Sequence, residues 1–127
     1  MEIKCKPGHS LELSMQVEEK DTAAAYGSGM VKVFASPAMI AFMENTALKA
    51  VLDFLPQGYN TVGTAVNVSH IKATPVGMKV TCKAEIVKIE GRKLVYAVKA
   101  WDEEGLIGEG EHTRFIIDLE RFMSKLK

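Results

Sequence analysis

The stretch Phe34-Ala-Ser-Pro-Ala-Met-Ile-Ala-Phe-Met-Glu-Asn-Thr-Ala-Leu-Lys-Ala-Val-Leu-Asp-Phe-Leu55 decides the fold, because it predicts one long helix that is apolar around most of its circumference. Ser36 suits the N-cap, Pro37 suits the first helical position, and the turn residues Pro56-Gln-Gly58 end the helix. Its polar side chains recur every four residues in one narrow solvated stripe: Asn45, Lys49 and Asp53. Other structure is expected to wrap a helix of this kind.

One carboxylate, that of Glu44, falls within the apolar part of this helix. Ile40 and Ala41 lie one turn before it, and Ala47 and Leu48 lie one turn after it. A carboxylate in such surroundings is costly unless it is paired, hydrogen-bonded or protonated. We therefore expect Glu44 to have a specific partner elsewhere in the chain.

The composition is that of a single globular domain spanning residues 1–127. Hydrophobic residues make up 47% of the chain, and 16 basic residues balance 16 acidic ones, so no nucleic-acid partner is expected. No apolar run is long enough to span a membrane, and the N-terminus lacks the apolar segment of a signal peptide. These features predict a cytoplasmic protein without a membrane partner, in which Cys5 and Cys82 stay reduced.

The rest of the chain predicts mainly β-strands joined by short turns. Alternating and β-branched runs place strands at 10–17, 61–71, 78–90, 93–101 and 106–118, with a bulge near Ile86-Val87 and a short final helix over 119–127. Hairpin connections make neighbouring strands antiparallel. The predicted fold class is therefore α+β, a curved antiparallel sheet of about five strands wrapped around one long central helix. Exposed sheet edges favour a homodimer formed by edge pairing, or a dimer of such dimers.

The segment between the first strand and the helix, residues 18–33, is less regular. Thr22 to Tyr26 predicts one or two helical turns, which Gly27-Ser-Gly29 interrupts. Two interpretations of this segment remain open. It is either a lid or pocket wall ahead of the helix, or an ordinary surface loop.

His70 is the second polar residue expected on a core-facing surface. The strand face that should look at the helix consists of Val62, Thr64, Val66, Val68 and His70. A Glu44–His70 pair at the seam between helix and sheet would satisfy both groups and form a tunable acid–base pair. The structural alternatives are that Ser36 is only an N-cap and that His70 is a satisfied core histidine.

Five stretches of the sequence occur in an order that is found in a known family. They are Phe34-Ala-Ser-Pro-Ala-Met-Ile-Ala-Phe-Met-Glu44, Val62-Gly-Thr-Ala-Val-Asn-Val-Ser-His70, Ala73-Thr-Pro-Val-Gly77, Glu90-Gly-Arg-Lys-Leu94 and Ile107-Gly-Glu-Gly-Glu-His-Thr-Arg114. Together they resemble the hotdog-fold thioesterases, in the branch that includes fluoroacetyl-CoA thioesterase. The resemblance implies a hotdog fold and hydrolysis of an acyl-CoA thioester to the free acid and CoA, with the acyl group unspecified.

The resemblance also implies a set of site residues. Its catalytic trio falls on Ser36, Glu44 and His70, and it places Gly63 and Arg114 near the bound thioester. The backbone N–H groups of Gly63 and Thr64 are candidate oxyanion donors, because glycine permits close approach. CoA is part of the substrate, so no cofactor and no metal are expected. Sites in this family lie near the subunit interface, so Glu44 and His70 belong either to one chain or to two.

In the expected reaction His70 acts as general base and general acid. Glu44 either orients the attacking water or attacks the carbonyl itself, and Ser36 hydrogen-bonds the carboxylate. Two other functions remain open, a non-catalytic acyl-CoA-binding module and a hotdog hydratase or dehydratase.

Several charged residues have a weaker assignment. The cations available for the phosphates of CoA are Lys72, Arg92, Lys93 and Arg114. Of these, Lys72 and Lys93 are better explained as solvated surface charges. No role is predicted for His9 or His112. Two interpretations of His112 remain open: it lies beside Arg114 on the last strand and approaches the site, or it is a histidine at a sheet edge, which is the better explanation.

Overall fold

The computed structural model describes residues 3–126. In chain order the elements are β1 (Ser10–Gln16), the 3-10 turn η1 (Glu19–Asp21), α1 (Ala23–Tyr26), α2 (Ser36–Leu52), β2 (Tyr59–His70), β3 (Lys79–Glu90), β4 (Lys93–Asp102), β5 (Gly105–Asp118) and α3 (Leu119–Ser124). The five strands and the long helix lie where the sequence predicts them, with boundaries shifted by a few residues. Lys127, the last residue of the predicted final helix, lies outside the described residues.

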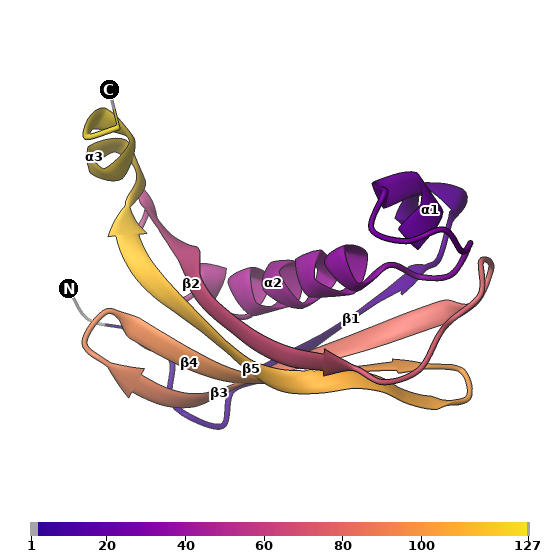
Figure 1. The fold of residues 1–127 in the computed structure, drawn as a ribbon. Coiled ribbons are helices and arrows are strands. Elements are labelled where there is room, and N and C mark those ends of the chain that lie inside the picture. The colour runs from indigo at the N-terminus through magenta and orange to yellow at the C-terminus, as the bar shows by residue number, and fades with distance from the viewer. Residues whose placement is uncertain (1–2, 127) are drawn as a thin grey trace.

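All five strands form one antiparallel sheet in the order β1-β3-β4-β5-β2. Figure 1 shows the sheet curving beneath α2, so that the helix lies along its concave side, with α1 and α3 near opposite ends. The bulge predicted near Ile86-Val87 is present, since the pairing of β3 with β4 shifts between Ile86 and Lys88. The predicted α+β class, a curved antiparallel sheet around one central helix, is confirmed.

The sheet covers only one side of α2, which corrects the expectation that the helix is wrapped on most sides. The helix residues buried against the rest of the chain are Ala38, Met39, Phe42, Met43, Thr46, Ala47, Ala50 and Val51. Between this face and the exposed face runs a half-buried stripe that includes Ile40, Glu44 and Leu48. Glu44 therefore lies at the margin of the core and not inside it, because five strands are too few to close around a helix.

The helix begins one position earlier than predicted. Ala35 is the N-cap residue without a side-chain cap, and Ser36 is already the first helical residue. The entry into the helix is held instead by burial of Phe34 and Ala35 and by the Ala35 N–H, which donates to the carbonyl of Asp21. The hydroxyl of Ser36 is therefore available to another partner.

β2 forms one edge of the sheet, and a bulge divides it. Its pairing with β5 shifts between Gly63 and Ala65, which leaves Thr64 without an opposite residue. A bulge of this kind reverses the side-chain alternation of a strand. Thr61 is buried before the bulge, whereas Val68 packs against the core after it. The predicted inward face, from Val62 to His70, is therefore correct only for its last residues.

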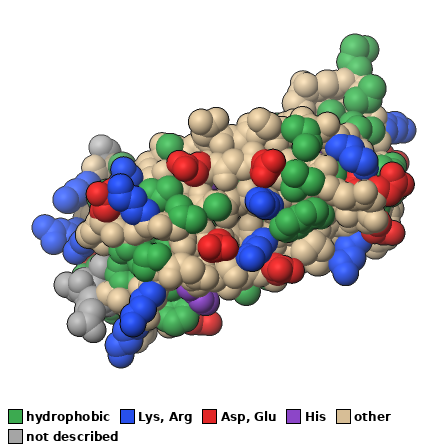
Figure 2. Space-filling view, turned by 90° about the horizontal axis from the view of Figure 1, so that it is seen from below, with side chains coloured by type: hydrophobic (Ala, Val, Ile, Leu, Met, Phe, Trp, Pro, Cys, Tyr) green, Lys and Arg blue, Asp and Glu red, His purple; other side chains and the backbone are tan. Residues whose placement is uncertain are grey.

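The surface and the cysteines agree with what the composition indicates. Figure 2 views the outer face of the sheet, where basic, acidic and apolar side chains are interspersed. Cys5 and Cys82 are both buried free thiols. Within residues 3–126, none of the helices combines the length and the apolar character needed to cross a membrane.

Candidate functional site

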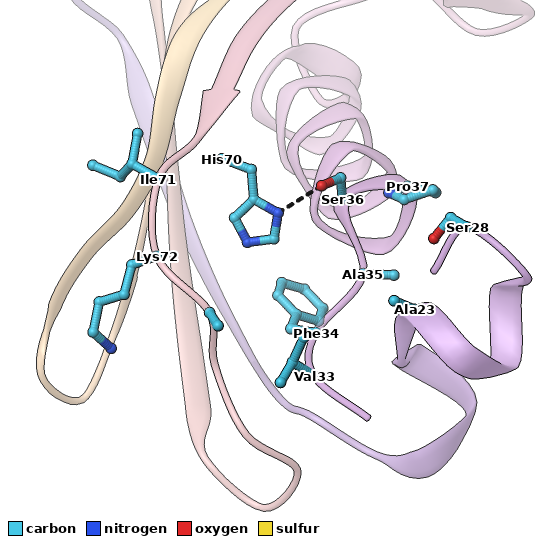
Figure 3. A pocket seen from close by; sticks show the side chains of 11 residues that line it. Ala23, Ser28, Val33, Phe34, Ala35, Ser36, Pro37, His70, Ile71 and Lys72 are labelled. Carbon is cyan, nitrogen blue, oxygen red and sulfur yellow. Dashed lines mark hydrogen bonds between the residues drawn. The ribbon is translucent and has the colours of Figure 1, made fainter. Parts of the chain in front are cut away.

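The first part of the candidate site joins the start of α2 to the end of β2 (Figure 3). Oγ of Ser36 lies 2.7 Å from Nδ1 of His70, and the ring of Phe34 meets the imidazole edge-on at 6.5 Å between centroids. Burial lowers the pKa of His70 below its ordinary value, so the ring is neutral at pH 7. Its second nitrogen, Nε2, is buried and makes no hydrogen bond within the described residues.

A cavity of about 360 Å³ opens beside this pair. One wall is the segment 70–73 that follows β2, and the opposite wall includes Ser28 and Val33. The irregular segment ahead of the helix is therefore a pocket wall, the first of the two interpretations left open by the sequence. The outer residues of this wall are exposed, at 96% for Met30 and 58% for Val31.

A buried carboxylate fixes the wall that follows β2. The side chain of Asp102 accepts hydrogen bonds from Nζ of Lys72 at 2.6 Å, from Oγ1 of Thr74 at 2.9 Å and from two backbone N–H groups of the β4–β5 turn. Burial raises the pKa of Asp102, but these hydrogen bonds outweigh burial and hold it below its ordinary value. Lys72 is thus the ion-pair partner of Asp102, which corrects its assignment as a solvated charge.

The second part of the site lies two turns further along α2, where Glu44 faces the bulge of β2. A Cβ placed on Gly63 would lie 3.0 Å from Oε2 of Glu44, 3.2 Å from Cε1 of His112 and 3.4 Å from Nη1 of Arg114. These three side chains therefore surround Gly63, where the missing side chain leaves room for a ligand atom. The structure brings together Glu44, Gly63 and Arg114, and Thr64 follows as the bulged residue.

Two residues of β5 form the floor of this second part. Arg114 is buried, and it donates from Nε to Oγ1 of Thr61 and from Nη2 to the carbonyl of Thr61, both at 2.8 Å. His112 is only 1% exposed, so it is a core residue and not the edge histidine that was expected. The alternation of side chains along β5 could have predicted this burial from the sequence, since His112 shares one strand face with Arg114 and Ile116. The error arose because the edge strand is β2 and not β5.

The two parts are separate within one chain, and this corrects two expectations. Ser36 and Glu44 lie eight residues apart on α2, which is about 12 Å along the helix axis. His70 contacts Ser36, so the predicted Glu44–His70 pair does not form within one chain, and Ser36 binds the imidazole instead of the carboxylate. The reason is that the start of α2 meets the end of β2, whereas Glu44 meets Gly63 nearer the start of that strand.

Comparison with known proteins identifies the family. The sequence profile of the fluoroacetyl-CoA-specific thioesterases matches residues 17–120. The chain belongs to this family. The fluoroacetyl-CoA thioesterase of Streptantibioticus cattleyicolor is 41% identical over 96 residues, which are 76% of this chain and 69% of that protein.

Solved structures of the fluoroacetyl-CoA-specific thioesterase family and its neighbours share the fold. The fluoroacetyl-CoA thioesterase FlK matches with a TM-score of 0.91 at 34% identity, over 96% of this chain and 95% of FlK. A thioesterase superfamily member from Thermus thermophilus matches with a TM-score of 0.87 at 28% identity, over 95% and 90% of the two chains. Mutants of FlK have been crystallised with fluoroacetate and CoA, and with acetyl-CoA. The predicted hotdog fold is confirmed.

Proposed function

We propose that the protein hydrolyses the thioester of a short acyl-CoA, at a site that combines the two parts described above. The observation that carries the proposal is the Glu44 carboxylate, which faces Gly63 and the bulged strand edge beside Arg114 in a member of a thioesterase family. In the reaction a C–O bond forms from water, the C–S bond breaks, and the leaving thiolate takes up a proton. No metal or cofactor is needed, since CoA is part of the substrate.

Glu44 acts on the carbonyl carbon of the thioester. A thioester bound above Gly63 lies within reach of its carboxylate, which either activates a water molecule or attacks the carbonyl to give an anhydride. Arg114 supplies positive charge close to the reacting group. A single turnover in heavy-oxygen water tests the anhydride route, because label enters Glu44 only when water opens an anhydride at the Glu44 carbonyl.

The bulge supplies donors for the carbonyl oxygen. Thr64 stands outside the regular pairing of β2 with β5, and Gly63 beside it has no side chain to block approach. Backbone N–H groups aimed at the oxygen stabilise the charge that develops in the tetrahedral intermediate. The hydroxyl of Thr64 makes only a 3.4 Å contact with the carbonyl of Thr113, so the proposed donors are backbone groups.

His70 carries the proton. In the proposed arrangement its Nδ1–H donates to Oγ of Ser36, which leaves Nε2 as the basic nitrogen. Nε2 makes no hydrogen bond with a described residue, and burial lowers the pKa of the ring, so this nitrogen is unprotonated in the proposed arrangement. The imidazole takes a proton from water and returns it to the leaving thiolate.

A second copy of the chain brings the two parts together. β2 is an edge strand, and its central residues 63–67 are all exposed. The half-buried apolar side chains of Ile40 and Leu48 on α2 border Glu44 and are also left uncovered in part. Pairing two such edges beyond the bulge would satisfy the backbone groups there and cover this apolar stripe, while the N–H groups at the bulge stay available to the carbonyl oxygen.

The register of that pairing follows from the positions of the two parts on β2. Antiparallel pairing about a twofold axis near Val66 and Asn67 sets Gly63 opposite the partner's His70. Each site then contains Glu44 of one subunit and the Ser36–His70 pair of the other. A homodimer would therefore hold two equivalent sites.

The proposed activity is tested by free-thiol release from a panel of acyl-CoAs. The panel runs from acetyl-CoA and fluoroacetyl-CoA to long-chain esters, and wild-type protein is expected to release thiol from short members. The relatives' named ligands, fluoroacetate and acetyl-CoA, favour this range. Tight binding of acyl-CoA by folded protein without thiol release from any ester would overturn the proposal and indicate a binding module.

Replacement of Gly63 by alanine tests the space in front of Glu44. The new methyl group would lie 3.0 Å from Oε2 of Glu44 and 3.4 Å from Nη1 of Arg114, so it displaces the carboxylate and occupies the place of the thioester. We expect kcat/KM to fall at least roughly tenfold, because the methyl group takes space from the thioester and moves the carboxylate by a few tenths of an ångström; a misplacement of about 1 Å would cost roughly 10²-fold. Ser14→Ala, an exposed change on β1 at the opposite edge of the sheet, is the control. Equal activity of both variants would contradict the placement of the substrate.

A further inference from the structure

His112 is the most buried histidine near the site, and the proposed mechanism does not use it. It lies beneath Gly63 on β5, with Arg114 two residues further along the same face. The ring of Tyr96 on β4 stacks on its imidazole with 6.1 Å between centroids and 26° between planes. The position and plane of the imidazole are therefore fixed by the core.

The hydrogen bonds of His112 define its tautomer. Nδ1 lies 2.8 Å from the carbonyl oxygen of Ala65, which can only accept, so Nδ1 carries the proton. Nε2 lies 3.2 Å from Nη1 of Arg114, which can only donate, so Nε2 is the acceptor. A protonated ring would turn Nε2 into a donor facing a guanidinium. Burial lowers the pKa of His112, as does Arg114, and the ring is accordingly neutral.

Three hydrogen bonds to two residues thus set the direction of the Arg114 guanidinium. At one end Thr61 accepts from Nε and Nη2, and at the other end His112 accepts from Nη1. Nη1 is also the nitrogen nearest to Gly63. Without the acceptor on His112, the Thr61 contacts alone would hold Arg114, and Nη1 would lose the bond that fixes it beside Gly63.

We infer that His112 is a positioning residue for thioester hydrolysis. Its neutral imidazole spans the Ala65 carbonyl of the bulged strand and Arg114, and so fixes the guanidinium relative to Glu44 and the bound thioester. The inference rests on the proposed function. Cε1 of His112 borders the place of the thioester, but the inference assigns the imidazole no part in making or breaking bonds. The groups that face its ring are Arg114, Glu44 and the Tyr96 phenol, together with the Ala65 carbonyl.

Two substitutions separate the two hydrogen bonds of His112. In His112→Asn the amide nitrogen replaces Nδ1 and keeps the bond to Ala65, but no acceptor reaches Arg114. In His112→Gln the amide oxygen reaches the place of Nε2 and restores the acceptor. We expect kcat/KM of His112→Asn to fall roughly ten- to hundred-fold, mainly in kcat, because a hydrogen bond to a charged group is lost. His112→Gln should keep most of the wild-type kcat/KM.

The melting temperature of each variant is measured beside its activity. A folded His112→Asn protein with wild-type kcat/KM would overturn the inference. So would equal losses of kcat/KM in both variants that are explained by a lower melting temperature alone. The tautomer is measured independently from the nitrogen NMR shifts of the wild-type imidazole, which should show a proton on Nδ1 and none on Nε2. The NMR measurement does not need turnover. A proton on Nε2 and none on Nδ1 would therefore overturn the inference even where thiol release is observed. Absence of thiol release overturns the proposed function instead.

Discussion

Replacing Glu44 by glutamine is expected to lower kcat by about 10²- to 10⁴-fold. Glutamine keeps the size of the side chain and its place beside Gly63, but it has no negative charge with which to activate water or attack the carbonyl. The loss should appear in kcat more than in KM, because the carboxylate acts on the reacting carbon and not on the distant parts of CoA. Thiol release at saturating substrate measures it directly.

The control for this change is Glu12→Gln, which removes an exposed carboxylate from β1. Since Glu44 is only half-buried, Glu44→Gln should keep the wild-type melting temperature within a few degrees. A folded Glu44→Gln protein with kcat within a few-fold of wild type would show that Glu44 takes no part in the reaction. The site would then have to be sought at the Ser36–His70 pair alone.

Mixed dimers of two inactive variants are expected to regain activity. Glu44→Gln and His70→Ala each damage both sites of a homodimer, but a mixed dimer contains one site with neither change. Random reassembly of equal amounts makes half the dimers mixed, so about a quarter of the wild-type activity should return. The measurement is thiol release after coexpression or after joint unfolding and refolding.

A second mixture controls for nonspecific recovery. Ser36 and His70 are hydrogen-bonded within one chain, so they belong to the same part of the site. Mixing Ser36→Ala with His70→Ala should therefore restore no intact site. No recovery in the Glu44 and His70 mixture, despite proven exchange of subunits, would show that each chain holds a complete site of its own.

Most of the fold could be predicted from the sequence because its signals are local. The β1 strand alternates, the β3–β4 hairpin has a tight turn at Gly91, and α2 begins at Ser36-Pro37 and ends before Pro56. The predicted start of α2 lies one residue too late, because serine is a favourable N-cap and the sequence alone places Ser36 in that position. Here the buried Phe34 and Ala35 fix the chain, and a distant histidine competes for the hydroxyl.

The site was predicted only in part because it depends on strand pairing. The residues Ser36, Glu44, His70, Gly63, Thr64 and Arg114 all lie in one part of the site or the other, but their pairing differs from the prediction. The bulge at Thr64 reverses the alternation of β2, and nothing in the local sequence marks it apart from Gly63. His112 was missed because its partners, Ala65 and Arg114, become its neighbours only when β5 pairs with β2.

The two walls of the cavity at His70 differ in how firmly they are held, which bears on the range of acyl groups that the proposed thioesterase would accept. The wall that follows β2 is tied to Asp102, whereas the opposite wall ends in the exposed residues Met30 and Val31. The second wall is held to α1 by backbone hydrogen bonds, such as that from the Ala24 N–H to the Val31 carbonyl, but its side chains at Met30 and Val31 make few contacts that a substitution would lose. Such a cavity would favour some acyl lengths over others by degrees and would not exclude any length completely. Substitutions at residues 26–31 are therefore expected to change which acyl groups the proposed site accepts, without moving the reactive side chains.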